Sequence, residues 1–212
     1  MDENLDLKKY YFHSVGDAIR IREALKLELF NLNEEDKKII DKFTSIFKFK
    51  AILSRNELMK KAKIVHKGYA TGVASMNDDR HISIAPFNPE VQFGAFDLFI
   101  SDAIAFIIDN AIEKKLKFLT DRDGNYPEII GSPGELQVYK KIPLKFFKGV
   151  MVASVKYKEE EHRRILENGT EDERAKLKQE LALSEYVYDL LESMKVKLSV
   201  YSKEGVKIPR IG

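Results

Sequence analysis

Acidic side chains gather in the segment 118–131, FLTDRDGNYPEIIG, and just after it. Asp121 and Asp123 are two residues apart, and Glu128 and Glu135 follow further along the chain. Carboxylates that converge can hold Mg²⁺ ions and activate water, which would make the protein a metal-dependent hydrolase or nuclease. Gln137, however, stands where a two-metal nuclease usually has a lysine. The alternative interpretation, an Asp-Gly turn between two strands, is favoured by the turn chemistry of the segment.

Histidines offer a second candidate for metal binding or acid–base chemistry. The chain has four of them, at His13, His66, His81 and His162, and none of these is spaced like the ligands of a helical zinc motif. If the strands expected around them pair as a hairpin, His66 and His81 face each other, with Asp78 and Asp79 at the tip. Such a cluster could bind a metal or transfer protons. The alternative is that both histidines are strand residues with satisfied hydrogen bonds, and that the acids are solvated.

Glycines in the segment 68–75, GYATGVAS, raise the question of a nucleotide cofactor. The segment lacks the G-K-[ST] ending of a phosphate-binding loop and the G-x-G-x-x-G of a dinucleotide-binding turn. Glycines at bulges in a strand explain it better. We therefore expect no cofactor, apart from a divalent metal if the acidic segment is a site.

Lysines and aromatic residues are interleaved in the segment 136–158, LQVYKKIPLKFFKGVMVASVKYK, which contains no acid. A second basic segment, 48–67, has Glu57 as its one acidic residue. Lysines on a sheet surface can neutralise phosphates while aromatic rings stack on bases. The residues predicted to bind nucleic acid are Tyr139, Lys140, Lys141, Lys145, Phe146 and Lys148. The alternative is a core strand flanked by solvated lysines.

The overall composition limits the classes of function. The 212 residues include 36 basic and 34 acidic side chains, for a net charge of +2, so any affinity for nucleic acid must come from local clusters of charge. The chain has no cysteine, which excludes disulfides, thiolate metal sites and a cysteine nucleophile. The absence of cysteine together with many lysines and glutamates is also typical of thermophilic proteins.

The N-terminal region, 1–60, is expected to be mainly helical. Asn33 can cap a helix that follows it, because three acids occupy the first turn and apolar residues recur along one face. The segment 17–31 contains helix formers but also alternates with a period of two, so it is open between helix and strand. Strands are expected next, over 62–87.

The segment 95–115 is apolar nearly all round, and this pattern predicts a helix buried within the domain. On such a helix Asp102, Asp109 and Glu113 would form one stripe. We interpret this stripe as the wet face of the helix rather than a set of buried acids. The aspartates also interrupt the apolar run 93–112, so a membrane span is not expected.

The C-terminal half is predicted to contain further strands, a short helix over 159–167 and a long amphipathic helix over 170–194. Thr170 and Glu173 form a capping box at the start of the long helix. Its wide apolar face contains Leu177, Leu181, Leu183, Val187, Leu190, Leu191 and Met194. That face would pack on the chain's own sheet or support a homo-oligomer.

Blocks of helices and strands without regular alternation predict an α+β fold. We expect one domain, 1–212, with a mainly antiparallel sheet, a buried central helix, a helical N-terminal subregion and a long amphipathic C-terminal helix. The predicted function is that of a soluble, cytoplasmic binding or assembly protein that contacts nucleic acid. A metal-dependent hydrolase and a structural oligomer subunit, such as a virion or complex component, are the alternatives.

Overall fold

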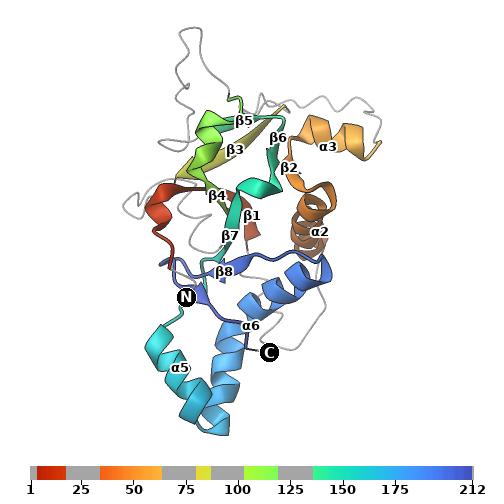
Figure 1. Cartoon of the computed structure of the whole chain (residues 1–212). Helices are drawn as coiled ribbons and strands as arrows, with labels where there is room; N and C mark the ends of the chain where they lie inside the picture. The colour runs from red at the N-terminus through yellow and green to blue at the C-terminus, as the bar shows by residue number, and fades with distance from the viewer. Residues whose placement is uncertain (1–3, 18–33, 64–79, 87–102, 119–135, 212) are drawn as a thin grey trace.

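The fold is built on a seven-stranded sheet (Figure 1). The computed structural model describes residues 4–17, 34–63, 80–86, 103–118 and 136–211. Along the sheet the strands run β5 (Leu136–Tyr139), β3 (His81–Pro86), β1 (Tyr10–Asp17), β4 (Ala103–Asp109), β7 (Phe147–Val152), β8 (Ser199–Tyr201) and β9 (Lys207–Ile208). All neighbours are antiparallel except β7 and β8. The α+β class is therefore confirmed.

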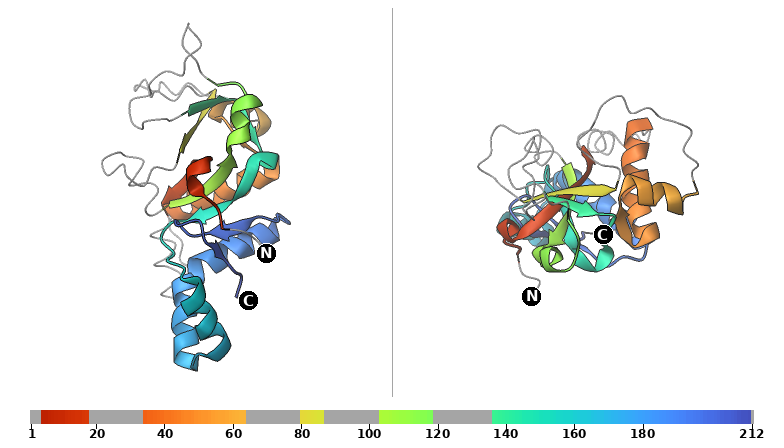
Figure 2. Two further views of the ribbon diagram at one scale, coloured as in Figure 1. Left: turned by 60° about the vertical axis from the view of Figure 1, so that its left-hand side comes forward. Right: turned by 90° about the horizontal axis from the view of Figure 1, so that it is seen from above.

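The remaining elements are short strands, helices and 3-10 turns that surround this sheet. A two-stranded sheet joins β2 (Ala51–Leu53) to β6 (Lys141–Pro143). The helices are α2 (Glu34–Phe49), α3 (Arg55–Lys61), α5 (Glu159–Asn168) and α6 (Glu171–Ser193), and the 3-10 turns are η1 (Leu7–Lys9), η2 (Asn110–Lys114) and η3 (Leu144–Phe146). In the two views of Figure 2, α2 and α3 lie on one side of the sheet, while α5 and the start of α6 project from one end.

The expected central helix is wrong where the structure describes it, because residues 103–109 form strand β4 between β1 and β7. Phe106 and Ile107 are both fully buried, and they belong to different apolar clusters on the two faces of the sheet. A strand that is covered on both faces loses the polar alternation that identifies strands, so it resembles a buried helix in sequence. Asp109 ends the strand and accepts a hydrogen bond from the Ala111 amide at 2.8 Å, which starts η2.

The N-terminal region is helical only in part. β1 is a strand that pairs with both β3 and β4, whereas the helix predicted after Asn33 is present as α2. Phe12 and Val15 are buried in the two different apolar clusters, as the three-residue step along a strand requires. Asn33 and the rest of the segment 18–33 lie outside the described residues, so the choice between helix and strand for 17–31 is not tested.

Helix α2 is held on the sheet by an aromatic cluster. Phe43 stacks on Phe106 with ring centroids 5.2 Å apart, and Phe47 meets the same ring edge-on at 5.7 Å. The ring centroid of Phe147 in β7 lies 4.9 Å from the ring centroid of Phe106. Aromatic pairs at these distances add to the free energy of burial. They fix the position of α2 and of β2, which follows it directly.

The C-terminal helices match their predictions closely. The Thr170 hydroxyl accepts from the Glu173 amide at 3.2 Å, and the Glu173 carboxylate accepts from the Thr170 amide at 2.8 Å, so the capping box is confirmed. The predicted apolar face of α6 packs into the larger cluster of the chain's own core, with Leu190 and Met194 half-buried at its edge. Among the described residues, no helix has the length and apolarity needed to cross a membrane.

Candidate functional site

The acidic segment lies outside the part of the chain that the structure describes. This holds for Asp121, Asp123, Glu128 and Glu135, and equally for His66, Asp78 and Asp79. Within the described ranges, no three histidines or carboxylates gather as metal ligands would. His81 is described on β3, where it lies opposite Tyr139 of β5 with the two rings 5.4 Å apart. The metal-dependent alternative therefore stays a prediction.

The two basic segments of the sequence meet in the small sheet. β2 belongs to the first segment and β6 to the second, and they pair in the register Ala51↔Pro143, Ile52↔Ile142 and Leu53↔Lys141. Ile52 and Ile142 are buried and anchor the pair to the core, while Lys141 is exposed. Pairing of these strands therefore brings Lys50, which precedes β2, close to the lysines in and beside β6.

Two further lysines flank the ribbon in the left-handed backbone conformation. Lys50, between α2 and β2, has φ of 52°, and Lys140, between β5 and β6, has φ of 66°. The Lys140 amide donates to the Arg80 carbonyl at 2.7 Å, and the Lys140 carbonyl accepts from the Ser54 amide at 2.8 Å. The Lys50 carbonyl accepts from Leu144 at 3.0 Å. The backbone at both ends of the ribbon is thus held in place by hydrogen bonds.

We call Lys50, Lys140, Lys141 and Lys145 the ribbon lysines. All four are exposed, and none forms an ion pair with a described acidic residue. The ammonium groups of Lys140 and Lys145 lie over the rings of Tyr139 and Phe146, 5.0 and 5.3 Å from the ring centroids. The positive charge of the ribbon is therefore available to an external anion.

The aromatic side chains of the second basic segment are less accessible than its lysines. Phe146 and Phe147 are 8% and 6% exposed and belong to the core, so their rings cannot serve as stacking platforms in this structure. Tyr139 is half-buried. The packed core therefore leaves the lysines of this segment accessible and covers its phenylalanine rings, which the sequence pattern alone does not show.

Lys148 differs from the ribbon lysines because its charge is compensated. Its ammonium group lies 2.8 Å from the Asp109 carboxylate, which connects β7 to the end of β4. The hydrogen bond between them lowers the pKa of Asp109 and raises the pKa of Lys148. Lys148 is predicted to bind nucleic acid, and in the structure it forms an ion pair between two interior strands of the sheet.

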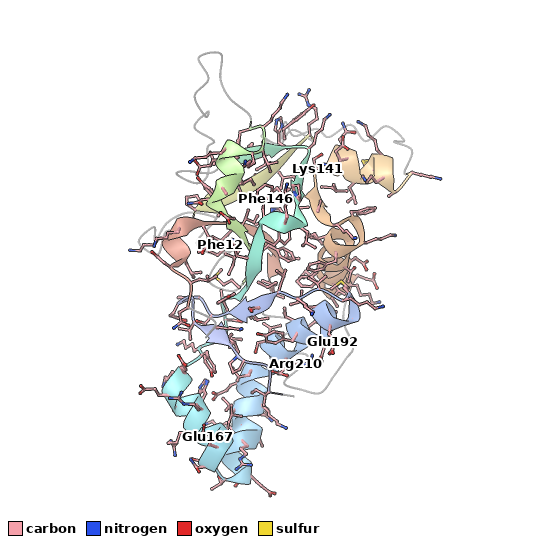
Figure 3. All side chains as sticks on the ribbon, viewed as in Figure 1. Phe12, Lys141, Phe146, Glu167, Glu192 and Arg210 are labelled. Carbon is pink, nitrogen blue, oxygen red and sulfur yellow. The ribbon has the colours of Figure 1, made fainter. Side chains whose placement is uncertain are left out.

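Several of the described acidic residues lie at the opposite end of the molecule. The α5–α6 hairpin contains Glu159, Glu160, Glu161, Glu167, Glu171, Asp172 and Glu173, partly offset by arginines. Figure 3 shows Lys141 near one end of the molecule and Glu167 near the other. Part of the negative charge of the described residues therefore lies far from the ribbon lysines.

A pocket of about 370 Å³ lies beside the ribbon, between helices α2 and α3 and strands β1, β2 and β3. Its lining contains Lys42, Arg55, His13 and His81, three serines and a set of apolar side chains, and no acidic residue among the described residues that line it. No motif in the sequence indicates this site. Its residues come from five elements, and no local pattern connects His13 to Lys42.

His13 is oriented by its own hydrogen bond. The β1–β3 register covers Tyr11↔Pro86 and Phe12↔Ala85, and just beyond it His13 Nδ1 donates to the Ser83 carbonyl at 2.9 Å. Burial and the nearby charge of Lys42 lower the pKa of His13 from 6.5 to about 4. The ring is therefore neutral near pH 7, with Nε2 as a hydrogen-bond acceptor.

Lys42 reaches into the pocket from α2 and donates to the Ser14 carbonyl at 2.9 Å. Although Lys42 as a whole is exposed, its ammonium group lies among protein atoms, and this burial lowers its pKa. A lysine ammonium has three donors, and one of them is used here. The pair of His13 and Lys42 thus presents one acceptor and a cation with further donors.

Comparison of the chain with models of protein families, with curated proteins and with solved structures found no match.

Proposed function

We propose that the protein binds nucleic acid through the ribbon lysines. The observation that carries this proposal is the pairing of β2 with β6, which brings the exposed Lys50 of the first basic segment close to the exposed lysines of the second. Phosphate groups bind surface lysines without regard to base sequence, and they release counterions when they do so. The proposal therefore concerns a backbone contact, with base readout left to other parts of the chain.

The backbone conformation of two ribbon lysines supports the proposal. A residue other than glycine in the left-handed region costs about 1 kcal/mol, and glycine avoids that cost. Lys50 and Lys140 both occupy this region at the ends of the ribbon. Lys63 and Lys195, which follow α3 and α6 outside the ribbon, share this conformation, so a charge needed at the ribbon is one explanation for Lys50 and Lys140 beside the favourable position of a cation after a helix. Lys50 also follows a helix C-terminus, where a cation is favourable in its own right.

The separation of charge also supports the proposal. The acidic α5–α6 hairpin lies at the far end of the molecule from Lys141, so it repels a phosphate backbone weakly at the ribbon (Figure 3). At physiological salt, charges farther apart than about 8 Å are largely screened from one another. The ribbon can therefore act as a local basic surface on a nearly neutral protein.

The direct test is charge reversal with a control of equal charge. In the test variant Lys50, Lys141 and Lys145 become glutamate, and in the control Lys176, Lys178 and Lys203, which are exposed elsewhere, become glutamate. Fluorescence anisotropy would follow binding to labelled single strands and duplexes of about 20 nucleotides at low salt. We expect the test variant to lose at least about tenfold in affinity and the control to lose much less. Equal losses in the two variants would overturn the proposal.

A further inference from the structure

The pocket beside the ribbon has the chemistry of an anion site. Lys42 brings a positive charge and His13 an imidazole, Arg55 and His81 also line the pocket, and no described lining residue is acidic. A cavity of about 370 Å³ is within the size range of small-molecule sites. A lysine ammonium that keeps unused hydrogen-bond donors binds carboxylates and phosphates through charge-assisted hydrogen bonds. The lining therefore favours a negatively charged occupant.

The apolar part of the lining indicates that the ligand also has an apolar body. Ile46 and Phe49 of α2, Ile52 of β2 and Leu58 of α3 form this part of the wall. Ligand sites commonly combine an apolar wall with a few polar groups that fix orientation. Inorganic ions would leave this wall unused. An organic anion with an apolar body would cover the wall and bring its head group to the cations.

We propose that this pocket binds a small organic anion, with a carboxylate or phosphate head group at Lys42 and His13 and an apolar body against Ile46, Phe49 and Leu58. The Lys42 ammonium has donors beyond the one bonded to Ser14, and these bind the head group. His13 Nε2 accepts from a hydroxyl of the ligand, or takes a proton and becomes a second donor. The site is independent of the ribbon lysines, because none of them lines the pocket.

Proton uptake by His13 is a consequence that can be measured. Lys42 on α2, Arg55 on α3 and His81 on β3 are the titratable or charged groups that line the pocket with His13. Burial and, after it, the charge of Lys42 keep the pKa of His13 low; an anion beside Lys42 offsets the second cause, so the pKa of His13 rises when the ligand binds. Binding therefore tightens as the pH falls through the raised pKa of His13, as long as the head group stays ionised.

The experiment compares ligands that share one apolar body. Calorimetric titration with octanoate, octyl phosphate and the neutral octanol separates the charge from the chain, and inorganic phosphate tests the charge alone. We expect either octyl anion to bind at least about tenfold more tightly than octanol and than inorganic phosphate. The tighter of the two anions identifies the head group. Equal binding of octanol and both anions overturns the proposal.

Two variants locate the site. Lys42→Met keeps the aliphatic stem and is expected to weaken binding of the octyl anion about tenfold or more. Its matched control is Lys37→Met on the same helix, where Lys37 pairs with Glu34 at 2.7 Å outside the pocket, and this variant should bind normally. Unchanged binding by Lys42→Met contradicts the proposal. A titration of the His13 ring signals in the unmodified protein gives a second readout, since an unaltered His13 pKa with bound ligand also contradicts it.

Nucleic-acid affinity distinguishes this site from the proposed function. Lys42→Met should retain the affinity of the unmodified protein for single strands, and the ribbon variant should retain affinity for the octyl anion. Loss of both activities in either variant would mean one shared site and would overturn the assignment of a separate pocket.

Discussion

The amide of Ser54 donates to the carbonyl of Lys140 at 2.8 Å, and this hydrogen bond joins the two basic segments just beyond the β2–β6 ribbon. Ser54 also caps α3, since its hydroxyl accepts from the Glu57 amide at 3.3 Å. One residue therefore fixes both the start of α3 and the position of Lys140. The basic surface is consequently built into the backbone of the fold rather than carried on independent loops.

The left-handed lysines allow stability to be separated from function. Changing Lys50 and Lys140 together to glycine should not lower the free energy of unfolding and should raise it by up to about 1 kcal/mol, because glycine accepts positive φ without strain. The same variant should bind nucleic acid more weakly, because two charges are lost. Urea unfolding and anisotropy measure the two effects. A stable variant with full affinity would show that these two lysines have no part in binding.

We expect half-buried His13 and buried His162 to make the fold sensitive to mild acid. Burial lowers the pKa of His162, which packs against the Tyr157 ring, and the pKa of His13 is lowered to about 4. In the unfolded chain both titrate near 6.5, so their contribution to stability is complete above pH 6.5 and is lost as the pH falls toward 4. Since the His13 ring is only half-buried, we expect it to account for about 2 kcal/mol of this loss.

The measurement is urea unfolding between pH 7.5 and 5, a range in which most carboxylates remain ionised. His13→Gln and His162→Gln should each flatten the dependence of the unfolding free energy on pH. A protein whose stability is constant over this range would contradict the assignment of neutral, buried rings.

The capping box predicts a measurable cost at the start of α6. Thr170→Ala removes the hydroxyl that accepts from Glu173 and should lower the free energy of unfolding by about 1 kcal/mol. Ser193→Ala is a matched control at the other end of the helix, because the Ser193 hydroxyl only donates back to Leu190. Denaturant unfolding of both variants gives the comparison. Equal stabilities would mean that the cap contributes nothing to the folded state.

Features set by neighbouring residues were predictable from the sequence. Thr170 and Glu173 are three positions apart, and the helix they cap begins where this spacing requires. The strands around Val138 and Val150 are expected from the sequence, and the α+β class follows from the order of the elements. β4 was misread because Phe106 and Ile107 are both buried on opposite faces, which removes the alternation on which such predictions depend.

The group of ribbon lysines was only partly predictable, because long-range contacts decide which residues lie together. The lysines are visible in the sequence, but the pairing of Leu53 with Lys141 that brings them together is a long-range contact. Burial of Phe146 and the ion pair between Lys148 and Asp109 likewise depend on the packed sheet. The pocket of His13 and Lys42 left no pattern in the sequence at all, because its walls come from separate elements.

The dependence of nucleic-acid affinity on salt tests the central claim most directly. Four phosphate contacts to a single strand give a slope of about −3 for the logarithm of the binding constant against the logarithm of salt concentration. We predict this slope for the unmodified protein, and a slope smaller in magnitude by about 3 when all four ribbon lysines are changed to glutamine. The same slope in both proteins, or no binding by the unmodified protein at low salt, would contradict the account.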